Sequence, residues 1–393
     1  MAGSVILAGA RTPIGKLSGG LGGFAATDLG GFAIKAALGR AGVSPDQVDY
    51  VFMGQVLQAG TGQISARQAG VNAGIPMTVP ATTVNKVCLS GLNAVFLADL
   101  LINSGAAEVV VAGGMESMTQ APYLLPGARQ GYRLGDKSVV DSMMYDGLFC
   151  AFDQVAMGAG TERYAASAGL ARAPQDDLAS KSHERAAAAI KEGRFADEVV
   201  AVEVPQRRGD PVVVDTDEGV RPGTTPDSLA KLPPAFDKAG NITAGNASQI
   251  SDGAAAVVVV SKAVADRSGT EPLGEIVGYG QVAGPDPSLL TQPSRAIQQA
   301  LEGAGRQVAD VDLFELNEAF AAVGLASMAD LGITDDVVNV NGGAIALGHP
   351  IGMSGTRLAL TLLLELKRRG GGLGAAALCG GGGQGDAILF QAA

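Results

Sequence analysis

An internal duplication constrains the fold of this 393-residue chain more than any other feature of its sequence. Eight residues of segment 33–49 recur 263 positions later, namely Ala33, Ile34, Ala37, Leu38, Ala41, Gly42, Val48 and Asp49. In each copy an amphipathic helical stretch ends at a glycine and leads through a short link into an apolar strand. Such a repeat predicts two similar halves built from the same helix and strand units.

The match continues in the next unit of each half. Ser90-Gly91 and Ser354-Gly355 each open a helical stretch, at an offset of 264, and each stretch runs into an apolar strand that ends in glycines. Strands that alternate with helices at this spacing indicate parallel sheets with helices on both faces. We therefore predict an α/β fold whose duplicated halves pack in layers about a pseudo-twofold axis.

The regular alternation stops between residues 121 and 245, where Tyr, Met, Asp, Arg and Pro become frequent. This stretch contains one strong helix over 173–193 and a segment over 207–237 that is typical of loops and turns. We predict a helix opening at Ser248 and a strand over 257–260 where the first half resumes. The predicted domains are residues 1–120 plus 246–268, an inserted loop domain over 121–245, and residues 269–393.

Charge and cysteine content exclude several classes of protein. The chain carries 28 basic and 39 acidic residues without a block of like charge, so nucleic acid and anionic membranes are not expected partners. No apolar run is long enough to span a bilayer. Three cysteines without a recognisable signal peptide indicate a reducing compartment. We expect a cytoplasmic enzyme.

Cys88 stands where a β-branched run has ended and just before the helical stretch that Ser90-Gly91 opens. The unpaired N–H groups at a helix N-terminus favour an anion, so a cysteine there tends towards the nucleophilic thiolate. The alternative is a buried and inert cysteine that serves as a small hydrophobic residue. Residues elsewhere in the chain favour the reactive interpretation.

The duplication shows which functional groups are not simply repeated. Cys88 falls opposite Gly352, so the thiol belongs to the first half alone. The second half instead carries Asn317 after one predicted strand, His349 in a Gly- and Pro-rich loop, and Cys379 at the end of its last strand. Ligands of open α/β sheets bind at the carboxyl ends of the strands. We expect these four side chains to converge.

Their chemistry is mutually consistent. His349 can serve as the base that a cysteine nucleophile needs, whereas His183 lies in a polar helical segment and is expected to be solvated. Cys379 precedes a run of four glycines whose N–H groups can stabilise an oxyanion. A redox pair lacks the Cys-x-x-Cys spacing, and a zinc site lacks the spacing of its ligands. We expect no metal.

Four blocks of this sequence resemble the signatures of the thiolase family, in the family's order. They are Asn-Lys-Val-Cys-Leu-Ser-Gly around Cys88, Asn-Glu-Ala-Phe from Asn317, the segment 341–352 around His349, and Cys-Gly-Gly-Gly from Cys379. The resemblance runs nearly end to end and implies a thiolase-like fold. It is strongest to members that condense two acetyl-CoA molecules to acetoacetyl-CoA.

The resemblance implies a mechanism without a metal or redox cofactor, in which CoA and acyl-CoA are substrates. Cys88, activated by His349, would take the acyl group, and Cys379 would remove a proton from the methyl group of a second acetyl-CoA. One implied oxyanion hole consists of His349 with a water held by Asn317. The other consists of the backbone N–H groups of Cys88 and Gly381.

The resemblance also implies which residues bind CoA. They are Leu148, Met157, Arg221, Ser228, Ala235, Phe236, Ala244, Gly245, Ser248, Ala319 and Phe320. Arg221 would supply local positive charge for the nucleotide end, and its alternative is an ordinary surface arginine. Ala156 stands where short-chain members often have His, which leaves the preference for short acyl chains open.

Three functions are therefore weighed: a short-chain thiolase, a degradative 3-oxoacyl-CoA thiolase or decarboxylating condensing enzyme, and a non-catalytic acyl-CoA binding protein. The Cys379 block disfavours decarboxylation, because similar synthases place a second histidine in the active site and need no base to form the enolate. The family also implies fatty acid metabolism and either a homodimer or a homotetramer. In the homotetramer, a dimer of dimers, part of segment 119–146 makes the contact between dimers.

Overall fold

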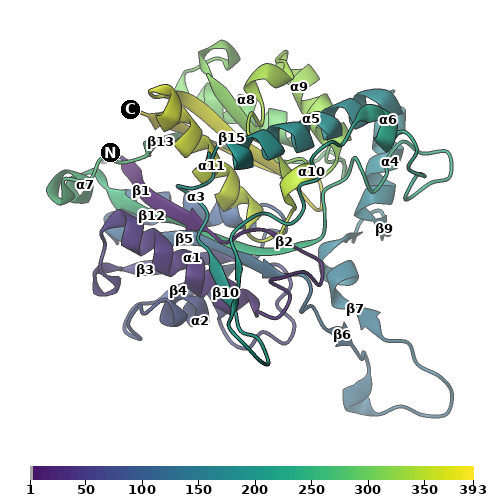
Figure 1. The fold of residues 1–393 in the computed structure, drawn as a ribbon, viewed down its shortest axis with the longest axis horizontal. Coiled ribbons are helices and arrows are strands. Elements are labelled where there is room, and N and C mark those ends of the chain that lie inside the picture. Colours follow the sequence, from purple (N-terminus) through teal and green to yellow (C-terminus); the bar gives the residue numbers. More distant parts are fainter. Residues whose placement is uncertain (1–2) are drawn as a thin grey trace.

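The computed structural model describes residues 3–393 and is built around one mixed ten-stranded sheet (Figure 1). Nine strands follow the order β14-β15-β16-β13-β1-β12-β5-β3-β4, and β2 pairs with β12 beside this path. The ten strands are β1 (Ser4–Arg11), β2 (Gly15–Lys16), β3 (Tyr50–Gly54), β4 (Ala81–Val84), β5 (Val109–Ser117), β12 (Ser251–Ser261), β13 (Gly274–Ala283), β14 (Leu313–Leu316), β15 (Gly372–Gly380) and β16 (Gln384–Ala392).

The duplication predicted from the sequence is visible in the strand order. The first half runs β1-β12-β5-β3-β4, and the second half repeats this order as β13-β16-β15-β14. An isolated parallel bridge between Phe314 and Val338 occupies the place that β4 has in the first half. The two halves meet where β1 pairs antiparallel with β13, at Val5 opposite Glu275. The predicted pair of similar halves is confirmed.

The prediction of parallel sheets is wrong for half of each copy. Only β3 with β4, β3 with β5, and β14 with β15 pair in parallel. β12 and β16 run antiparallel to both of their main neighbours. β16 follows β15 through the three-residue turn 381–383, which is too short for a parallel crossover. The predicted helix opening at Ser248 is also absent, because β12 already begins at Ser251.

Six helices pack in layers against the two halves of the sheet (Figure 1). An outer core joins the first half of the sheet to its helices, and a matching outer core serves the second half. A central core lies between the two halves and contains residues from the strands of each half. The outer helices are α1 (Ala26–Ala41) and α2 (Ser65–Asn72) on one side and α8 (Gln292–Ala304) and α9 (Ala321–Leu331) on the other, with α3 (Ser90–Asn103) and α11 (Ser354–Arg369) in the centre.

The duplicated Ser-Gly pairs explain how α3 and α11 meet. A Cβ on Gly355 would lie 2.3 Å from the backbone nitrogen of Leu92, and a Cβ on Gly91 would lie 2.9 Å from the carbonyl oxygen of Gly352. The hydroxyl of Thr356 donates to the carbonyl of Gly91 over 2.9 Å. Glycine at both positions therefore lets the two helix starts approach at the centre of the molecule.

The duplicated aspartates, Asp49 and Asp312, have the same structural role. Asp49 precedes β3, and its Oδ2 accepts the N–H groups of Glu108 and Val109 at the start of β5, over 2.8 and 2.9 Å. Asp312 precedes β14, and its Oδ2 accepts the N–H group of Leu373 on β15 over 2.8 Å. Each carboxylate thus pins the beginning of the neighbouring parallel strand, which accounts for its recurrence.

Within the inserted region α5 lies against the second half and β10 lies beside α1 of the first half, and an arm extends away from the body at the lower right of Figure 1. The arm carries the small β6 and β7 pair. None of the helices within residues 3–393 is both long and apolar enough to cross a membrane. The remaining elements are β6 (Tyr123–Leu124), β7 (Val140–Asp141), β8 (Phe149–Cys150), β9 (Val155–Ala156), α4 (Met157–Ser167), α5 (Arg172–Lys191), β10 (Val202–Val204), β11 (Val212–Val214), α6 (Pro226–Leu229), α7 (Lys262–Ser268) and α10 (Ala344–Leu347), with short helical turns at Pro45–Gln47, Ala128–Gln130, Met143–Gly147, Val308–Asp310 and Asp335–Val337.

Candidate active site

Cys88 lies in the tight turn between β4 and α3, where it is partly buried. The turn holds Val87 in the left-handed region at φ 52°, an unusual conformation for a β-branched residue. Ser90 stabilises it, since its hydroxyl accepts the N–H of Lys86 over 2.9 Å and donates to the carbonyl of Val87 over 2.5 Å. The serine of the duplicated Ser-Gly pair thus supports the turn that presents the thiol.

The thiol of Cys88 is protonated at rest. Burial raises its pKa to about 12, and the nearby carboxyl group of Glu116 adds to this rise. The backbone N–H groups of Cys88 and Gly381 oppose the shift but do not reverse it. The prediction of a thiolate at neutral pH is therefore wrong for the protein alone, because desolvation outweighs the helix terminus. A nucleophilic Cys88 needs a base.

His349 is buried and held by a hydrogen bond at each ring nitrogen. Its Nδ1 lies 2.6 Å from the hydroxyl of Ser354, which itself donates to the carbonyl of Pro350 over 3.0 Å. Its Nε2 lies 3.3 Å from the side-chain amide nitrogen of Asn317. With the serine proton donated to Pro350 and the amide nitrogen donating to the ring, Nδ1 carries the imidazole proton and the Nε2 lone pair accepts the Asn317 N–H.

The protonation state of His349 suits a base. Burial, and then the charge of Arg357, lowers its pKa to about 3, so the imidazole is neutral at physiological pH. The guanidinium of Arg357 is itself buried and paired with Glu315 over 2.8 Å. A neutral imidazole with its lone pair on Nε2 can accept a proton from a thiol.

Asn317 follows β14 directly and is fully buried. Its backbone N–H donates to the carbonyl of Ala377 over 3.0 Å, which fixes it beside β15. Its side-chain oxygen has no hydrogen-bond partner among the described residues. A buried amide oxygen without a partner fits a site that a water or substrate group completes.

Glu318, the next residue, anchors the segment that carries His349. Its buried carboxylate accepts hydrogen bonds from the hydroxyl of Ser182, the side-chain amide of Asn339 and the backbone N–H of Ile345, over 2.7 to 3.1 Å. A Cβ on Gly343 would lie 2.3 Å from the carboxyl carbon of Glu318, so this position has room only for glycine. The carboxylate therefore fixes the start of the His349 segment against Asn317.

Cys379 and Gly381 complete the group. Cys379 is buried at the end of β15, and its pKa is raised by burial and by the nearby sulfur of Cys88. The N–H of Gly381 lies close enough to Cys88 to lower the pKa of that thiol. The structure thus joins Asn317 to His349 and joins Cys88 to Gly381 and Cys379. Their catalytic roles stay predictions.

A cavity of about 860 Å³ opens beside this group. Val87 and Gly381 line the cavity next to Cys88. Met157, one of the predicted CoA-binding residues, also lines it. Aromatic side chains of the inserted region form another wall, where Tyr145 and Phe149 stack with ring centroids 6.4 Å apart. The remaining lining residues are Val56, Gln58, Ala59, Asn85, Asp146, Gly147, Cys150, Ala151, Phe152, Gly382 and Gln384.

Most of the predicted CoA-binding residues lie in two contacting groups. In the first, Phe236 packs edge to face on Phe320 with ring centroids 6.4 Å apart, and the N–H of Ser248 donates to the carbonyl of Ala319 over 3.0 Å. In the second, the N–H of Met157 donates to the carbonyl of Leu148 over 2.8 Å. Of the others, Gly245 is buried, whereas Arg221, Ser228, Ala235 and Ala244 are exposed.

His183 is buried, so the expectation of a solvated histidine is wrong. Its Nδ1 accepts the backbone N–H of Arg221 over 3.1 Å. Burial, and then the charge of Arg221, lowers its pKa to about 4. The polar neighbours of His183 on α5 suggested solvent, but the loop that covers it comes from a segment 38 residues later.

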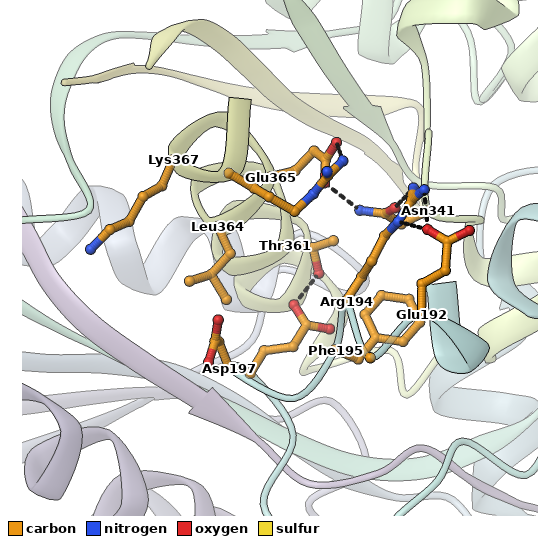
Figure 2. A pocket seen from close by; sticks show the side chains of 12 residues that line it. Glu192, Arg194, Phe195, Asp197, Asn341, Thr361, Leu364, Glu365 and Lys367 are labelled. Carbon is orange, nitrogen blue, oxygen red and sulfur yellow. Dashed lines mark hydrogen bonds and ion pairs between the residues drawn. The ribbon is translucent and has the colours of Figure 1, made fainter. Parts of the chain in front are cut away.

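A smaller cavity of about 270 Å³ lies between the end of α5 and α11, shown in Figure 2. Arg194 crosses it and donates to the side-chain oxygen of Asn341 over 2.8 Å, while the Asn341 amide donates to Glu365 over 3.0 Å. Glu365 also pairs with Arg368 and Arg369. This charged network ties the start of the His349 segment to α11, and none of the predicted site residues lines the cavity.

Among residues 3–393, no group of three or more His, Cys, Asp or Glu side chains is placed to hold a metal ion, and all three cysteines are free. The sequence did not point to Ser354 or Glu318 as parts of the site. The signal for Ser354 was present, because its duplicate Ser90 opens the helix behind Cys88. Glu318 stands in the Asn-Glu-Ala-Phe block, but that block did not indicate its role.

Comparisons with known proteins agree with this arrangement. The family model "Thiolase, N-terminal domain" matches residues 4–263, and "Thiolase, C-terminal domain" matches residues 270–392. A "Probable acetyl-CoA acetyltransferase" of Mycolicibacterium smegmatis is 57% identical over 98% of this chain and 100% of the relative. The "Acetyl-CoA acetyltransferase" of Cupriavidus necator is 52% identical over 98% of each chain. This chain belongs to the thiolase family.

Proposed function

We propose that this protein is an acetyl-CoA acetyltransferase, which condenses two acetyl-CoA molecules reversibly to acetoacetyl-CoA and CoA through an acyl-Cys88 intermediate. The observation that carries the proposal is that Cys88 lies beside Cys379 and Gly381, while the neutral imidazole of His349 lies beside Asn317. The names of the relatives support the same reaction.

In the first half-reaction the lone pair on Nε2 of His349 takes the proton of Cys88. The sulfur then forms a bond to the acetyl carbon, and the bond from that carbon to the sulfur of CoA breaks. The departing CoA thiolate takes up the proton of Cys379. Negative charge that develops on the acetyl oxygen is stabilised by the N–H groups of Cys88 and Gly381.

In the second half-reaction the thiolate of Cys379 removes a proton from the methyl group of a second acetyl-CoA. The carbanion forms a carbon–carbon bond to the acyl carbon, and the bond to the Cys88 sulfur breaks. His349 returns its proton to Cys88, and both thiols regain their resting state. Asn317 and His349 stabilise the enolate oxygen, with a water in contact with the Asn317 amide. No metal or redox cofactor takes part.

The two contacting groups described above bind CoA in this proposal. Phe236 and Phe320 present aromatic surface, Ser248 and Ala319 present polar backbone, and Met157 leads towards the cavity beside Cys88. The exposed Arg221 meets the phosphates of the nucleotide end. Ser228, Ala235, Ala244, Gly245 and Leu148 complete the proposed CoA site.

One observation favours a second candidate, a degradative thiolase that cleaves longer 3-oxoacyl-CoAs. The cavity beside Cys88 measures about 860 Å³ and has aromatic walls, which is far more space than an acetyl group fills. Ala156, at the edge of the same region, adds no bulk. The length of the acyl chain that the enzyme turns over fastest decides between the two candidate functions.

The test is the intact mass of the protein after brief incubation with acetyl-CoA, with Cys88→Ser in parallel. We expect a single acetyl adduct that Cys88→Ser abolishes, and acetoacetyl-CoA turnover that falls as the 3-oxoacyl chain lengthens. Faster turnover of longer chains would favour the degradative candidate. Absence of any adduct would contradict the assignment of Cys88 as the nucleophile. A non-catalytic acyl-CoA binding protein would then be the better description.

We also propose a cytoplasmic homotetramer. The arm between β6 and β7 supports the oligomer, because it exposes large apolar side chains, namely Tyr123, Leu125, Tyr132, Leu134 and Val139. Three free cysteines fit a reducing compartment. Light scattering on the wild type and on Leu134→Asp tests the assembly, and an unchanged mass in the variant would remove the arm from the interface.

A further inference from the structure

Glu116 is a fully buried carboxylate near the end of β5. Its two oxygens accept three backbone N–H groups, those of Val56 and Gly352 on Oε2 over 3.0 Å and that of Leu57 on Oε1 over 3.1 Å. A carboxylate that accepts three backbone N–H groups acts as a rigid connection between the segments that donate them.

The donors come from the two halves of the molecule. Val56 and Leu57 lie in the loop that follows β3, and Gly352 lies three residues after His349. Cys88 packs against the apolar cluster that contains Val56 and Leu57. A Cβ on Gly352 would lie 2.8 Å from Oε2 of Glu116, so the segment can approach the carboxylate only as glycine.

The charge of Glu116 also reaches the nucleophile. Burial raises the pKa of Glu116 to about 7, and its three N–H donors limit that rise. The charge of Asp252 on β12 raises the pKa of Glu116 further, and Glu116 in turn raises the pKa of the Cys88 thiol. Glu116 is thus a titrating group in electrostatic contact with Cys88.

We propose that Glu116 is a positioning residue for acyl transfer, whose carboxylate holds the loop after β3 and the Gly352 end of the His349 segment in place around Cys88. The proposal rests on the thiolase function proposed above and adds a residue to it. Glu318 anchors the beginning of the His349 segment, and Glu116 anchors its end.

The ionised carboxylate of Glu116 is the form that can hold these two segments in place. A proton on Oε1 would weaken the acceptor of the Leu57 N–H, and a proton on Oε2 would weaken that of the Val56 and Gly352 N–H groups. Activity should therefore fall as the pH decreases through about 7, the pKa of Glu116. His349 does not produce this decrease, because its pKa of about 3 keeps it neutral over the same range.

The experiment compares Glu116→Gln with the wild type and with Asp49→Asn. Asp49 is the matched control, since its carboxylate accepts two backbone N–H groups at the opposite end of β5. For Glu116→Gln we expect kcat to fall at least about tenfold with KM for acetoacetyl-CoA nearly unchanged, as displaced catalytic groups produce. The decrease in kcat below about pH 7 should disappear in Glu116→Gln and persist in Asp49→Asn.

A second readout is alkylation of Cys88 by iodoacetamide as a function of pH, located by peptide mass. Loss of the negative charge should shift the alkylation profile of Glu116→Gln to lower pH, which a purely structural role would not do. Should Glu116→Gln fail to fold by thermal melting, Glu116→Asp takes its place, and it should keep the acidic decrease with a lower kcat.

Wild-type kcat and pH dependence retained in Glu116→Gln, with an unchanged alkylation profile, would overturn the positioning role. That outcome is distinct from failure of the proposed function, in which the wild type itself forms no acetyl adduct.

Discussion

Replacing Ser354 by Ala tests how His349 is held in its active form. The hydroxyl of Ser354 is buried and accepts the Nδ1 proton of His349 over 2.6 Å. In Ser354→Ala this N–H has no partner, and a buried unsatisfied donor costs about 1–3 kcal/mol. The ring can avoid the cost by moving its proton to Nε2, but that tautomer cannot accept the proton of Cys88.

The tautomer balance sets the expected size of the effect. A bias of about 1–3 kcal/mol corresponds to a roughly fivefold to 150-fold loss of the reactive tautomer. We therefore expect acylation of Cys88 by acetyl-CoA to slow by that factor. KM should change little, because Ser354 does not line the cavity beside Cys88.

The assay is the rate of acetyl adduct formation in a single turnover, followed by intact mass. Ser354→Thr keeps the hydroxyl and should recover most of the rate. Ser167→Ala is the matched control, because its exposed hydroxyl donates only to the carbonyl of Arg163. A rate for Ser354→Ala within about twofold of the wild type would refute the reasoning, since the Nδ1 hydrogen bond would then not select the tautomer.

Gly355→Ala should lower the melting temperature by several degrees and reduce soluble yield, because its Cβ would lie 2.3 Å from the backbone nitrogen of Leu92; an unchanged melting curve would contradict this. The pKa of His183 is about 4 in the folded protein, below the value of about 6.5 expected for the unfolded chain. The free energy of unfolding should therefore fall by about 3 kcal/mol as the pH decreases from about 6.5 to 4. His183→Gln should lose less stability over that range in urea unfolding, with little change at pH 8. Lys86→Met removes the partner of the buried Asp386 and should destabilise the fold by about 3 kcal/mol, partly recovered in Lys86→Arg, as thermal melting would show.

The sequence determined the duplicated architecture and the identity of the chemical groups. Helix starts, glycine stops and apolar strands follow from local patterns, so the two halves and the starts of α3 and α11 were predicted well. The contrast between halves singled out Cys88, Asn317 and His349, because a functional residue does not need to recur. The structure shows His349 in contact with Asn317 at the end of β14, and Cys88 near Gly381 and Cys379 at the end of β15.

Only the tertiary structure decided the strand directions, because a fully buried strand such as β12 has the same apolar pattern whether its neighbours run parallel or antiparallel. Protonation states also lay beyond the sequence. The helix terminus at Cys88 is a local feature, but the burial that keeps the thiol protonated comes from segments distant in the chain. The groups that set the site, Glu116 and Glu318 among them, act through long-range hydrogen bonds that no local pattern records.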